Sequence, residues 1–326
     1  MRIFYKTLIF VIIIFFSLEI LSRLIFYSTL KISQMLGINL PNLIVSTLHV
    51  MTKNINELRY IDQQLGLIYQ HKDLGYAFKP DRAFDIVNPY GQKILYRTKD
   101  IFGDGEFGLR DDGIDKQMFA IAVGDSFTFC MHLEDKDCWV EIVESLLDLD
   151  VINTGVYGYG TYQESIMLKK VLRKLGSRSR EIKYILWQIT FTDYQDDSCF
   201  LEGKMCNIFS PLFIYTPVNK QSFLNYSFLI GIFFSLYDTI NYLISFNEIP
   251  KEPDESVFRE AQSICDEIGC KLIIIYAYRS YERPKLCRKY ECIYPRYSED
   301  MFIPGDRHLN VKGSNFLAQQ IIERLK

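Results

Sequence analysis

The chain has 326 residues, of which 48% are hydrophobic and 24% charged, with a formal net charge of −3 at pH 7. This composition predicts a folded protein with a sizeable core and excludes a largely disordered chain. The slight negative charge argues against a general nucleic-acid binder, so no nucleic-acid partner is expected. A cluster of basic side chains between residues 169 and 183 is interpreted as a solvated helix face, with contact to anionic head groups as the alternative.

Residues 1–30 predict a membrane anchor. Arg2 and Lys6 precede an apolar run over residues 7–18, and a second apolar stretch covers 24–30. Together the stretches are long enough to span a bilayer, and no small-residue cleavage site follows the first. The basic N-terminus favours a cytoplasmic start, so we expect an uncleaved signal anchor in the inner membrane with the rest of the chain on the periplasmic side. The alternative is a helix on the membrane surface or inside the protein.

The eight cysteines stand in four close pairs, none of them Cys-x-x-Cys, and the four histidines are scattered. A structural zinc site is therefore not expected, and no metal or other cofactor is predicted. An even, paired count is typical of disulfides in an oxidising compartment. Cys287 and Cys292, in a polar loop, are the better disulfide candidates, whereas Cys130 and Cys265 lie in apolar patterns that suit buried free thiols.

Residues 31–115 predict a lead-in, with amphipathic helices to about residue 60. An irregular stretch, 61–115, follows; it has short strand-like runs such as Ile94-Leu-Tyr96 and no core of its own. Strands and helices alternate after it. The predicted strands are Phe119–Val123, Val151–Asn153, Tyr184–Ile189 and Lys271–Tyr276, and the predicted helices are Cys138–Leu147, Tyr162–Leu175, Ser256–Ile268 and Val311–Leu325. This alternation predicts an α/β domain over 116–326, a three-layer α/β/α arrangement with a mainly parallel, flavodoxin-like sheet. A helical insertion at about 198–250 interrupts it and is interpreted as a buried or lid-forming helix.

A serine follows the first of these strands. The apolar run ends at Gly124, and Asp125 and Ser126 come directly after it. A serine in the turn after a core strand is held rigidly with its oxygen exposed, which suits a nucleophile. Taken alone, however, this stretch favours a cap for the following helix.

Asp306 and His308 stand two residues apart, shortly before the last predicted helix. In an extended loop such residues point to the same side, so one short segment can present a carboxylate and an imidazole together. An imidazole oriented by a carboxylate is the general base that a serine nucleophile needs, and plain turn chemistry is the alternative. Because loops at the carboxyl ends of parallel strands meet at one edge of the sheet, Ser126 belongs beside this pair, which favours the nucleophile.

With these residues the chain resembles the SGNH or GDSL-type hydrolases, in particular a membrane-anchored bacterial branch. Gly-Asp-Ser stands at 124–126, an Asn-x-Gly-x-x-Gly turn at 153–158, and the Asp and His before the last helix at 306 and 308. The lead-in motifs Leu74-Gly-Tyr and Gly108-Leu-Arg-Asp also resemble this branch. The resemblance implies Ser126 as nucleophile, His308 as base, Asp306 as its orienting group, and an oxyanion hole that includes the N–H groups of Ser126 and Gly158.

The third sequence block departs from the family pattern, because Thr192 stands where an Asn side chain would complete the oxyanion hole. A threonine hydroxyl is a shorter donor than an amide, and loss of one such donor costs about 10²–10³ in rate. We therefore expect a slower enzyme, a donor from elsewhere such as Gln188, or a site used for another purpose. His132, six residues after Ser126, is interpreted as a surface or packing histidine.

The resemblance implies a periplasmic, membrane-tethered serine esterase that acts on an acylated glycan or lipid. Removal of O-acetyl groups from an envelope polysaccharide is the first expectation, by analogy with the family. An O-acyltransferase with the same Ser-His-Asp triad is the first alternative. A catalytically lapsed glycan-binding module is the second, and Thr192 motivates it.

Overall fold

The computed structural model describes residues 14, 17–18, 67–88, 92–147, 149–201, 253–278, 284–303 and 308–326. Residues 62–214 and 250–326 form one compact unit, which holds the sheet and the candidate site. Among the described residues, no helix is long and apolar enough to cross a membrane. The predicted anchor at 1–30 lies outside these residues apart from three positions, and so does most of the insertion predicted at about 198–250.

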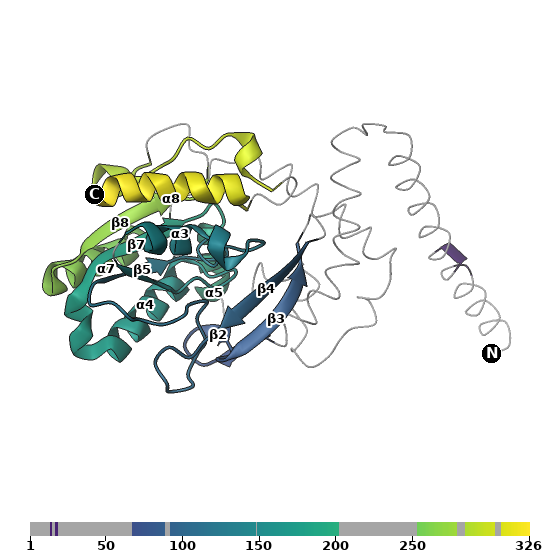
Figure 1. The fold of residues 1–326 in the computed structure, drawn as a ribbon, viewed down its shortest axis with the longest axis horizontal. Helices are drawn as coiled ribbons and strands as arrows, with labels where there is room; N and C mark the ends of the chain where they lie inside the picture. Colours follow the sequence, from purple (N-terminus) through teal and green to yellow (C-terminus); the bar gives the residue numbers. More distant parts are fainter. Residues whose placement is uncertain are drawn as a thin grey trace. The chain divides into compact units, whose positions relative to one another are not determined.

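A five-stranded parallel sheet, in the order β6-β5-β7-β8-β9, organises this unit (Figure 1). Its strands are β5 (Phe119–Val123), β6 (Asp150–Asn153), β7 (Ile182–Ile189), β8 (Lys271–Tyr276) and β9 (Glu291–Ile293). All five residues of β5 are buried, as a central strand covered on both faces requires. The mainly parallel sheet and the four strands predicted from sequence are confirmed, and β9 is an addition.

Helices cover both faces of the sheet (Figure 1). They are α3 (Trp139–Leu146), α4 (Thr161–Leu175), α5 (Asp193–Leu201), α7 (Glu255–Ile268) and α8 (Val311–Leu325). The helices α3 and α8 pack together on one face, while α4 and α7 lie on the other with α5 against α4. The predicted three-layer α/β/α arrangement is therefore confirmed.

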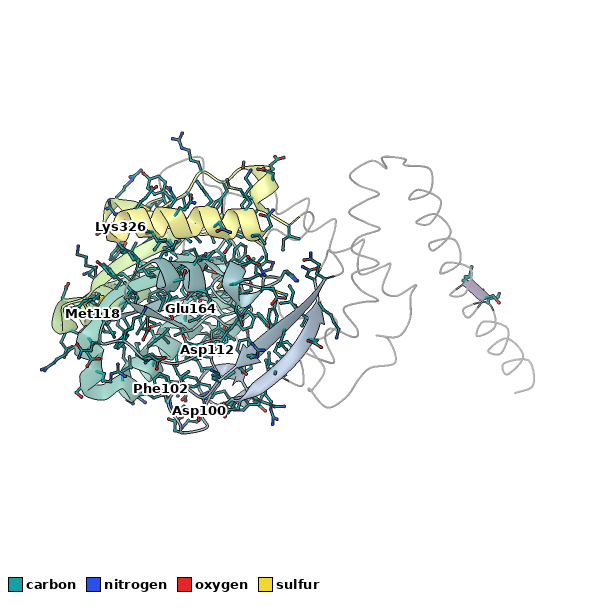
Figure 2. All side chains as sticks on the ribbon, in the orientation of Figure 1. Asp100, Phe102, Asp112, Met118, Glu164 and Lys326 are labelled. Atoms are coloured by element: carbon teal, nitrogen blue, oxygen red, sulfur yellow. A yellow bond between two sulfur atoms is a disulfide. The ribbon has the colours of Figure 1, made fainter. Side chains whose placement is uncertain are left out.

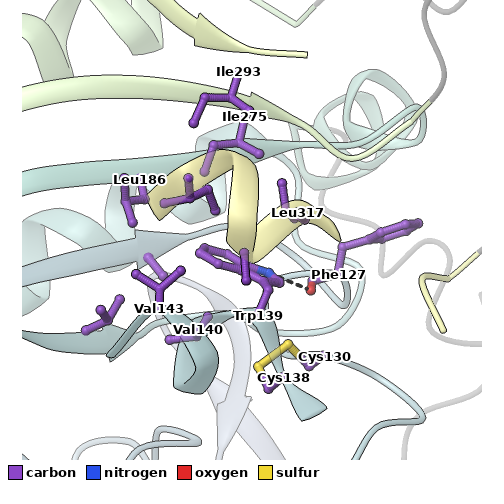
Figure 3. Close-up of a cluster of buried hydrophobic side chains, with 14 of the residues drawn as sticks. Phe127, Cys130, Cys138, Trp139, Val140, Val143, Leu186, Ile275, Ile293 and Leu317 are labelled. Atoms are coloured by element: carbon purple, nitrogen blue, oxygen red, sulfur yellow. Dashed lines mark hydrogen bonds between the residues drawn. A yellow bond between two sulfur atoms is a disulfide. The ribbon is translucent and has the colours of Figure 1, made fainter. Parts of the chain in front are cut away.

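Neighbouring residues of β7 show how the layers are held, because successive side chains of a strand point to opposite faces. Leu186 belongs to the buried cluster that includes Trp139 of α3 and Leu317 of α8 (Figure 3). Trp187 points the other way, where its ring centroid lies 5.1 Å from that of Phe258 in α7. Side chains from both faces fill the space between the sheet and its helices (Figure 2).

The lead-in is more regular than its composition predicts. It forms two antiparallel hairpins, β1 (Ile68–His71) with β2 (Gly75–Phe78) and β3 (Arg82–Val87) with β4 (Lys93–Thr98). The prediction of an irregular stretch is wrong here, because strands of four to six residues among turn residues leave little periodic signal. The hairpins belong to the same compact unit as the sheet.

Basic residues of α4 attach the lead-in to the helix. Lys170 Nζ lies 2.7 Å from Asp73 and 2.9 Å from the carboxylate of Glu106, and Lys174 also pairs with Glu106 at 2.6 Å. These lysines lower the pKa of Glu106 to about 2, chiefly through the hydrogen bond from Lys174. The interpretation of this cluster as a solvated face is therefore wrong for Lys170, which is buried against acidic partners.

Short-range disulfides join Cys130 to Cys138, Cys265 to Cys270 and Cys287 to Cys292. The pairing predicted for the polar loop is confirmed. The free-thiol interpretation of Cys130 and Cys265 is wrong, because their apolar surroundings also contain the partner sulfur. An apolar pattern indicates that a cysteine is buried but does not indicate whether it is paired.

Candidate active site

The candidate site lies at the carboxyl ends of β5 and β7. From β5 the chain continues to β6 on one side of it and then crosses to β7 on the other side. Open α/β sheets bind ligands at the carboxyl edge where the strand order reverses in this way. Ser126 follows β5, and the segment Thr190–Thr192 follows β7. The topology therefore places both predicted motifs at one edge.

Two glycines allow the turn that carries Ser126 to pack tightly. A Cβ added at Gly124 would lie 2.1 Å from Thr128 Oγ1, and one at Gly155 would lie 2.3 Å from the main-chain N of Phe129. The Asn153 side chain also donates to the Thr128 carbonyl at 3.0 Å. The asparagine and first glycine of the second sequence block therefore join the turn after β6 to the turn after β5.

The structure brings Ser126 and His308 together across 182 residues of sequence, with His308 Nε2 2.8 Å from Ser126 Oγ. The ring of Phe127 stacks on the imidazole at 4.6 Å, and the His308 carbonyl accepts a hydrogen bond from the Ile303 N–H at 2.8 Å. This separation is within the range for proton transfer between a nucleophile and a general base. The assignment of catalytic roles to the pair stays a prediction.

Asp306 lies outside the described residues, so its role as the orienting carboxylate also stays a prediction. Asp125 is a buried carboxylate near His308. It is 2% exposed, and its Oδ1 accepts the Phe127 N–H at 2.9 Å. Burial raises the pKa of Asp125 to about 6, although the Phe127 N–H and the nearby His308 act in the lowering direction. At neutral pH the Asp125 carboxylate can therefore stabilise a positive charge on the imidazole.

Further buried carboxyl groups lie behind Asp125. The hydroxyl of Thr190 lies 3.1 Å from Asp125 Oδ2 and 2.5 Å from Asp193 Oδ1. One hydroxyl proton cannot be donated to two acceptors, so a proton on Asp193 satisfies this arrangement best. Burial raises the pKa of Asp193 well above its usual value, and the charge of Asp125 acts in the same direction. Burial also raises the pKa of Glu164, whose carboxylate accepts a hydrogen bond from Trp187 Nε1 at 2.6 Å. These groups limit the negative charge beneath the site.

Two main-chain N–H groups that the sequence analysis assigned to an oxyanion hole, those of Ser126 and Gly158, have no acceptor among the described residues. Gly158 has a left-handed φ of 61° and is partly exposed, whereas the residues on either side of it are buried. Glycine adopts this conformation without the steric cost that a Cβ would bring. The second glycine of the Asn-x-Gly-x-x-Gly turn is therefore a partly exposed residue in a left-handed turn.

The side-chain donors considered from sequence are engaged elsewhere. The Thr192 hydroxyl lies 3.1 Å from the Thr190 hydroxyl, so these two groups share a hydrogen bond. Gln188 Oε1 accepts from Thr128 Oγ1 at 2.7 Å, and its Nε2 is covered by protein with no acceptor among the described residues. In this arrangement Gln188 does not present a donor to a substrate. The oxyanion role of Thr192 stays a prediction.

Sequence reasoning assigned no role to Arg110, which holds the end of the nucleophile turn. Its Nη1 donates to the carbonyls of Phe129 and Cys130 at 2.7 and 2.9 Å, and its Nη2 donates to the carbonyl of Leu133 at 2.7 Å. The motif Gly108-Leu-Arg-Asp was the only signal for it. The Trp139 indole N–H and the Cys130–Cys138 disulfide hold the same turn (Figure 3).

His132 is a buried packing residue and not a surface one, so the interpretation holds in part. Its N–H donates to the Tyr96 hydroxyl at 2.5 Å, and its ring meets that of His308 edge-on at 5.5 Å. In the described part of the chain, no group of three or more potential metal ligands could hold an ion.

The raised pKa of Asp111 makes the stability of the fold depend on pH. Asp111 accepts the N–H groups of Asn153 and Gly113, both at 2.8 Å, and burial raises its pKa to about 7. An unfolded Asp titrates at about 3.9, so between about pH 3.9 and pH 7 the folded chain binds a proton on Asp111 that the unfolded chain does not bind. This proton binding stabilises the fold at low pH, and the stabilisation is lost as the pH rises through about 7. The free energy of unfolding of the wild type, measured in urea, should therefore fall from pH 5 to pH 8. Asp111→Asn, which cannot titrate, should make this fall smaller by about 2–3 kcal/mol. Asp112→Asn, whose exposed side chain pairs with Lys99, should leave the decrease unchanged.

The comparisons with known proteins yield structures but no sequence family. No protein-family model matches the chain, and no curated protein matches it. Among solved structures the chain is similar to TesA, with 13% identity, 64% of this chain and 98% of that chain covered, and a TM-score of 0.36. It is also similar to a putative lipolytic protein of the G-D-S-L family from Desulfitobacterium hafniense, with 10% identity, 63% and 98% covered, and a TM-score of 0.31.

A third similar structure is the psychrotrophic esterase EstA from a Pseudoalteromonas species, with 10% identity, 64% and 96% covered, and a TM-score of 0.33. A doubly wound parallel sheet with a serine after its first strand and a histidine before its last helix is the layout that the sequence resemblance implies.

Proposed function

We propose that the chain is an SGNH-type ester hydrolase in which Ser126 is the nucleophile. The observation that carries the proposal is the 2.8 Å contact between His308 Nε2 and Ser126 Oγ at the carboxyl edge of the sheet. The N–H groups of Ser126 and Gly158, which have no acceptor among the described residues, supply donors for the oxyanion that an attacked ester would form.

The proposed reaction is acyl transfer through a covalent intermediate. His308 removes the proton of Ser126 as Oγ attacks the ester carbonyl, and Asp306 and Asp125 stabilise the imidazolium that results. The two main-chain N–H groups bind the tetrahedral oxyanion. His308 then protonates the leaving alcohol, and a water molecule, deprotonated by the same imidazole, releases the acyl group from Ser126.

The proposed substrate is an O-acyl ester, first an acetyl ester, on an envelope polysaccharide or lipid. We propose that residues 1–30 anchor the chain in the inner membrane with the hydrolase domain on the periplasmic side. The three short-range disulfides support this location, because disulfides persist in oxidising compartments.

A catalytically lapsed, glycan-binding module is the second candidate. Thr192 favours it, because a short hydroxyl bonded to Thr190 replaces the amide that the family pattern supplies. The retained contact between Ser126 and His308 favours the enzyme, since a binding module has no need of it.

A fluorophosphonate probe applied to the full chain tests the proposal, because such probes phosphonylate only an activated serine. We expect one labelled peptide, containing Ser126, in the wild type and no labelling of Ser126→Ala. Ser179→Ala is the control: its exposed hydroxyl bonds the Gly176 carbonyl, and labelling should persist. Equal labelling of wild type and Ser126→Ala would contradict the nucleophile, and no labelling together with measurable glycan binding would favour the binding module.

A further inference from the structure

The direction of the Gly158 N–H is fixed by the residue before it. The carbonyl of Tyr157 and the N–H of Gly158 belong to one planar peptide unit and point in opposite directions. A group that holds the Tyr157 oxygen therefore also aims the Gly158 N–H. This matters because Gly158 takes the left-handed conformation in a turn, where the peptide is not fixed by a helix or a strand.

The Tyr76 hydroxyl holds that oxygen. It donates to the Tyr157 carbonyl at 2.5 Å, and the Tyr76 side chain is 3% exposed. Burial raises the pKa of Tyr76 well above its usual value, so the phenol stays neutral and remains a donor. The Tyr157 ring is itself fixed by aromatic contacts, at 4.5 Å from Phe129 and 5.1 Å from Phe78.

The hairpin that carries Tyr76 is tied down on both sides. Gln163 Nε2 of α4 donates to the Leu74 carbonyl at 2.8 Å, and Lys170 of the same helix pairs with Asp73 at 2.7 Å. On the other side, the Gly108 N–H donates to the Phe78 carbonyl at 2.9 Å. A hydroxyl mounted on an element held in this way is fixed well enough to orient a catalytic group.

We propose that Tyr76 is a positioning residue of the oxyanion hole, which aims the Gly158 N–H by holding the carbonyl of the same peptide. The inference rests on the proposed function, in which that N–H binds the oxyanion. A hydrogen bond to the carbonyl also polarises the peptide, which strengthens its N–H as a donor. The lead-in hairpin thereby takes part in the chemistry of the domain that follows it.

Tyr159 offers a matched control. Its hydroxyl is also buried and donates to a main-chain carbonyl, that of Tyr76, and the two rings meet edge-on at 5.2 Å. Tyr159→Phe therefore removes the same kind of bond from the same hairpin and leaves the Tyr157 carbonyl with its donor. Both variants leave one buried carbonyl unsatisfied, so their free energies of unfolding should fall by similar amounts, about 1–3 kcal/mol.

The experiment compares wild type, Tyr76→Phe, Tyr159→Phe and Ser126→Ala of the full chain in hydrolysis of p-nitrophenyl acetate. We expect Tyr76→Phe to lower kcat about 10- to 100-fold with KM changed less than threefold, because the interaction is made mainly in the transition state. Tyr159→Phe should stay within about threefold of wild type in kcat. Hydrogen exchange of the peptide covering 154–160 should be faster in Tyr76→Phe than in Tyr159→Phe.

Equal kcat values for the two phenylalanine variants would overturn the inference while leaving the proposed function intact. An effect of Tyr76→Phe on KM alone would overturn it as well, since uniform binding is not oxyanion stabilisation. If wild type and Ser126→Ala turn over the ester equally, the proposed function fails and the inference fails with it. The comparison with Ser126→Ala therefore separates the two failures.

Discussion

Alanine at Ser126 or at His308 is expected to lower kcat for an ester substrate by about 10⁴–10⁶. The two side chains are 2.8 Å apart and act in one step, since the imidazole removes the proton while the serine oxygen attacks. Without the serine no acyl-enzyme forms, and without the histidine the hydroxyl is too weak a nucleophile at neutral pH. Steady-state hydrolysis of p-nitrophenyl acetate by the full chain measures the effect.

The double variant Ser126→Ala/His308→Ala sharpens this test. Residues that act as a unit are strongly non-additive, so the double variant should be no slower than either single variant by more than about tenfold. His132→Asn is the control histidine change. His132 has a left-handed φ of 71°, which Asn tolerates, and its main-chain bond to Tyr96 remains. A loss for His132→Asn as large as for His308→Ala would contradict the base assignment.

The sheet was predictable where strands are continuous apolar runs. The bounds predicted for Phe119–Val123 and Lys271–Tyr276 agree with β5 and β8, because central parallel strands are buried on both faces and carry an unbroken apolar signal. The edge strand β9 has three residues, Glu291-Cys-Ile, and a stretch that short has no detectable period. Of the four hairpin strands in the lead-in, only β4 gave a signal, the strand-like run Ile94-Leu-Tyr96, and the others were missed for the same reason.

The site was predictable as far as topology could bring motifs together. The convergence of strand ends at one edge was enough to place Ser126 beside His308. The supports of the site were not predictable, because Tyr76 and Arg110 act through hydrogen bonds to main-chain carbonyls. Any residue type can supply such a carbonyl, so the acceptors leave no pattern in the sequence. The donors appeared only as parts of two lead-in motifs without an assigned role.

Arg110→Met is expected to lower the free energy of unfolding by about 3–5 kcal/mol. Arg110 is 4% exposed, and all five of its N–H groups have acceptors. Those acceptors are the carbonyls of Phe129, Cys130 and Leu133 and, through Nε and Nη2, the carboxylate of Asp135. Methionine fills the space of the aliphatic stem but removes the arginine donors of the Phe129 and Leu133 carbonyls, while the Cys130 carbonyl keeps only the Leu133 N–H at 3.2 Å. Urea unfolding of the full chain measures the change.

Two further variants separate charge from geometry. Arg110→Lys keeps the positive charge but has three donors on one atom, which cannot reach carbonyls spread over the turn, so we expect it to recover less than half of the loss. Arg259→Met is the control, because the exposed side chain of Arg259 pairs with Glu255 at the surface and such a pair contributes at most about 1 kcal/mol. Full recovery by lysine would show that charge alone, and not the fork geometry, holds the turn.

Arg110→Met should also slow the reaction of Ser126, because Arg110 holds the turn that follows this serine in an unfavourable backbone conformation. Cys130 and His132 have left-handed φ values of 58° and 71°, which cost free energy for residues with a Cβ. Arg110 donates to the carbonyl of Cys130 and to that of Leu133, so these bonds offset the strain directly. Without them the turn can relax and move Ser126 away from His308. We therefore expect the rate of fluorophosphonate labelling to fall at least tenfold in Arg110→Met under conditions where it is still folded.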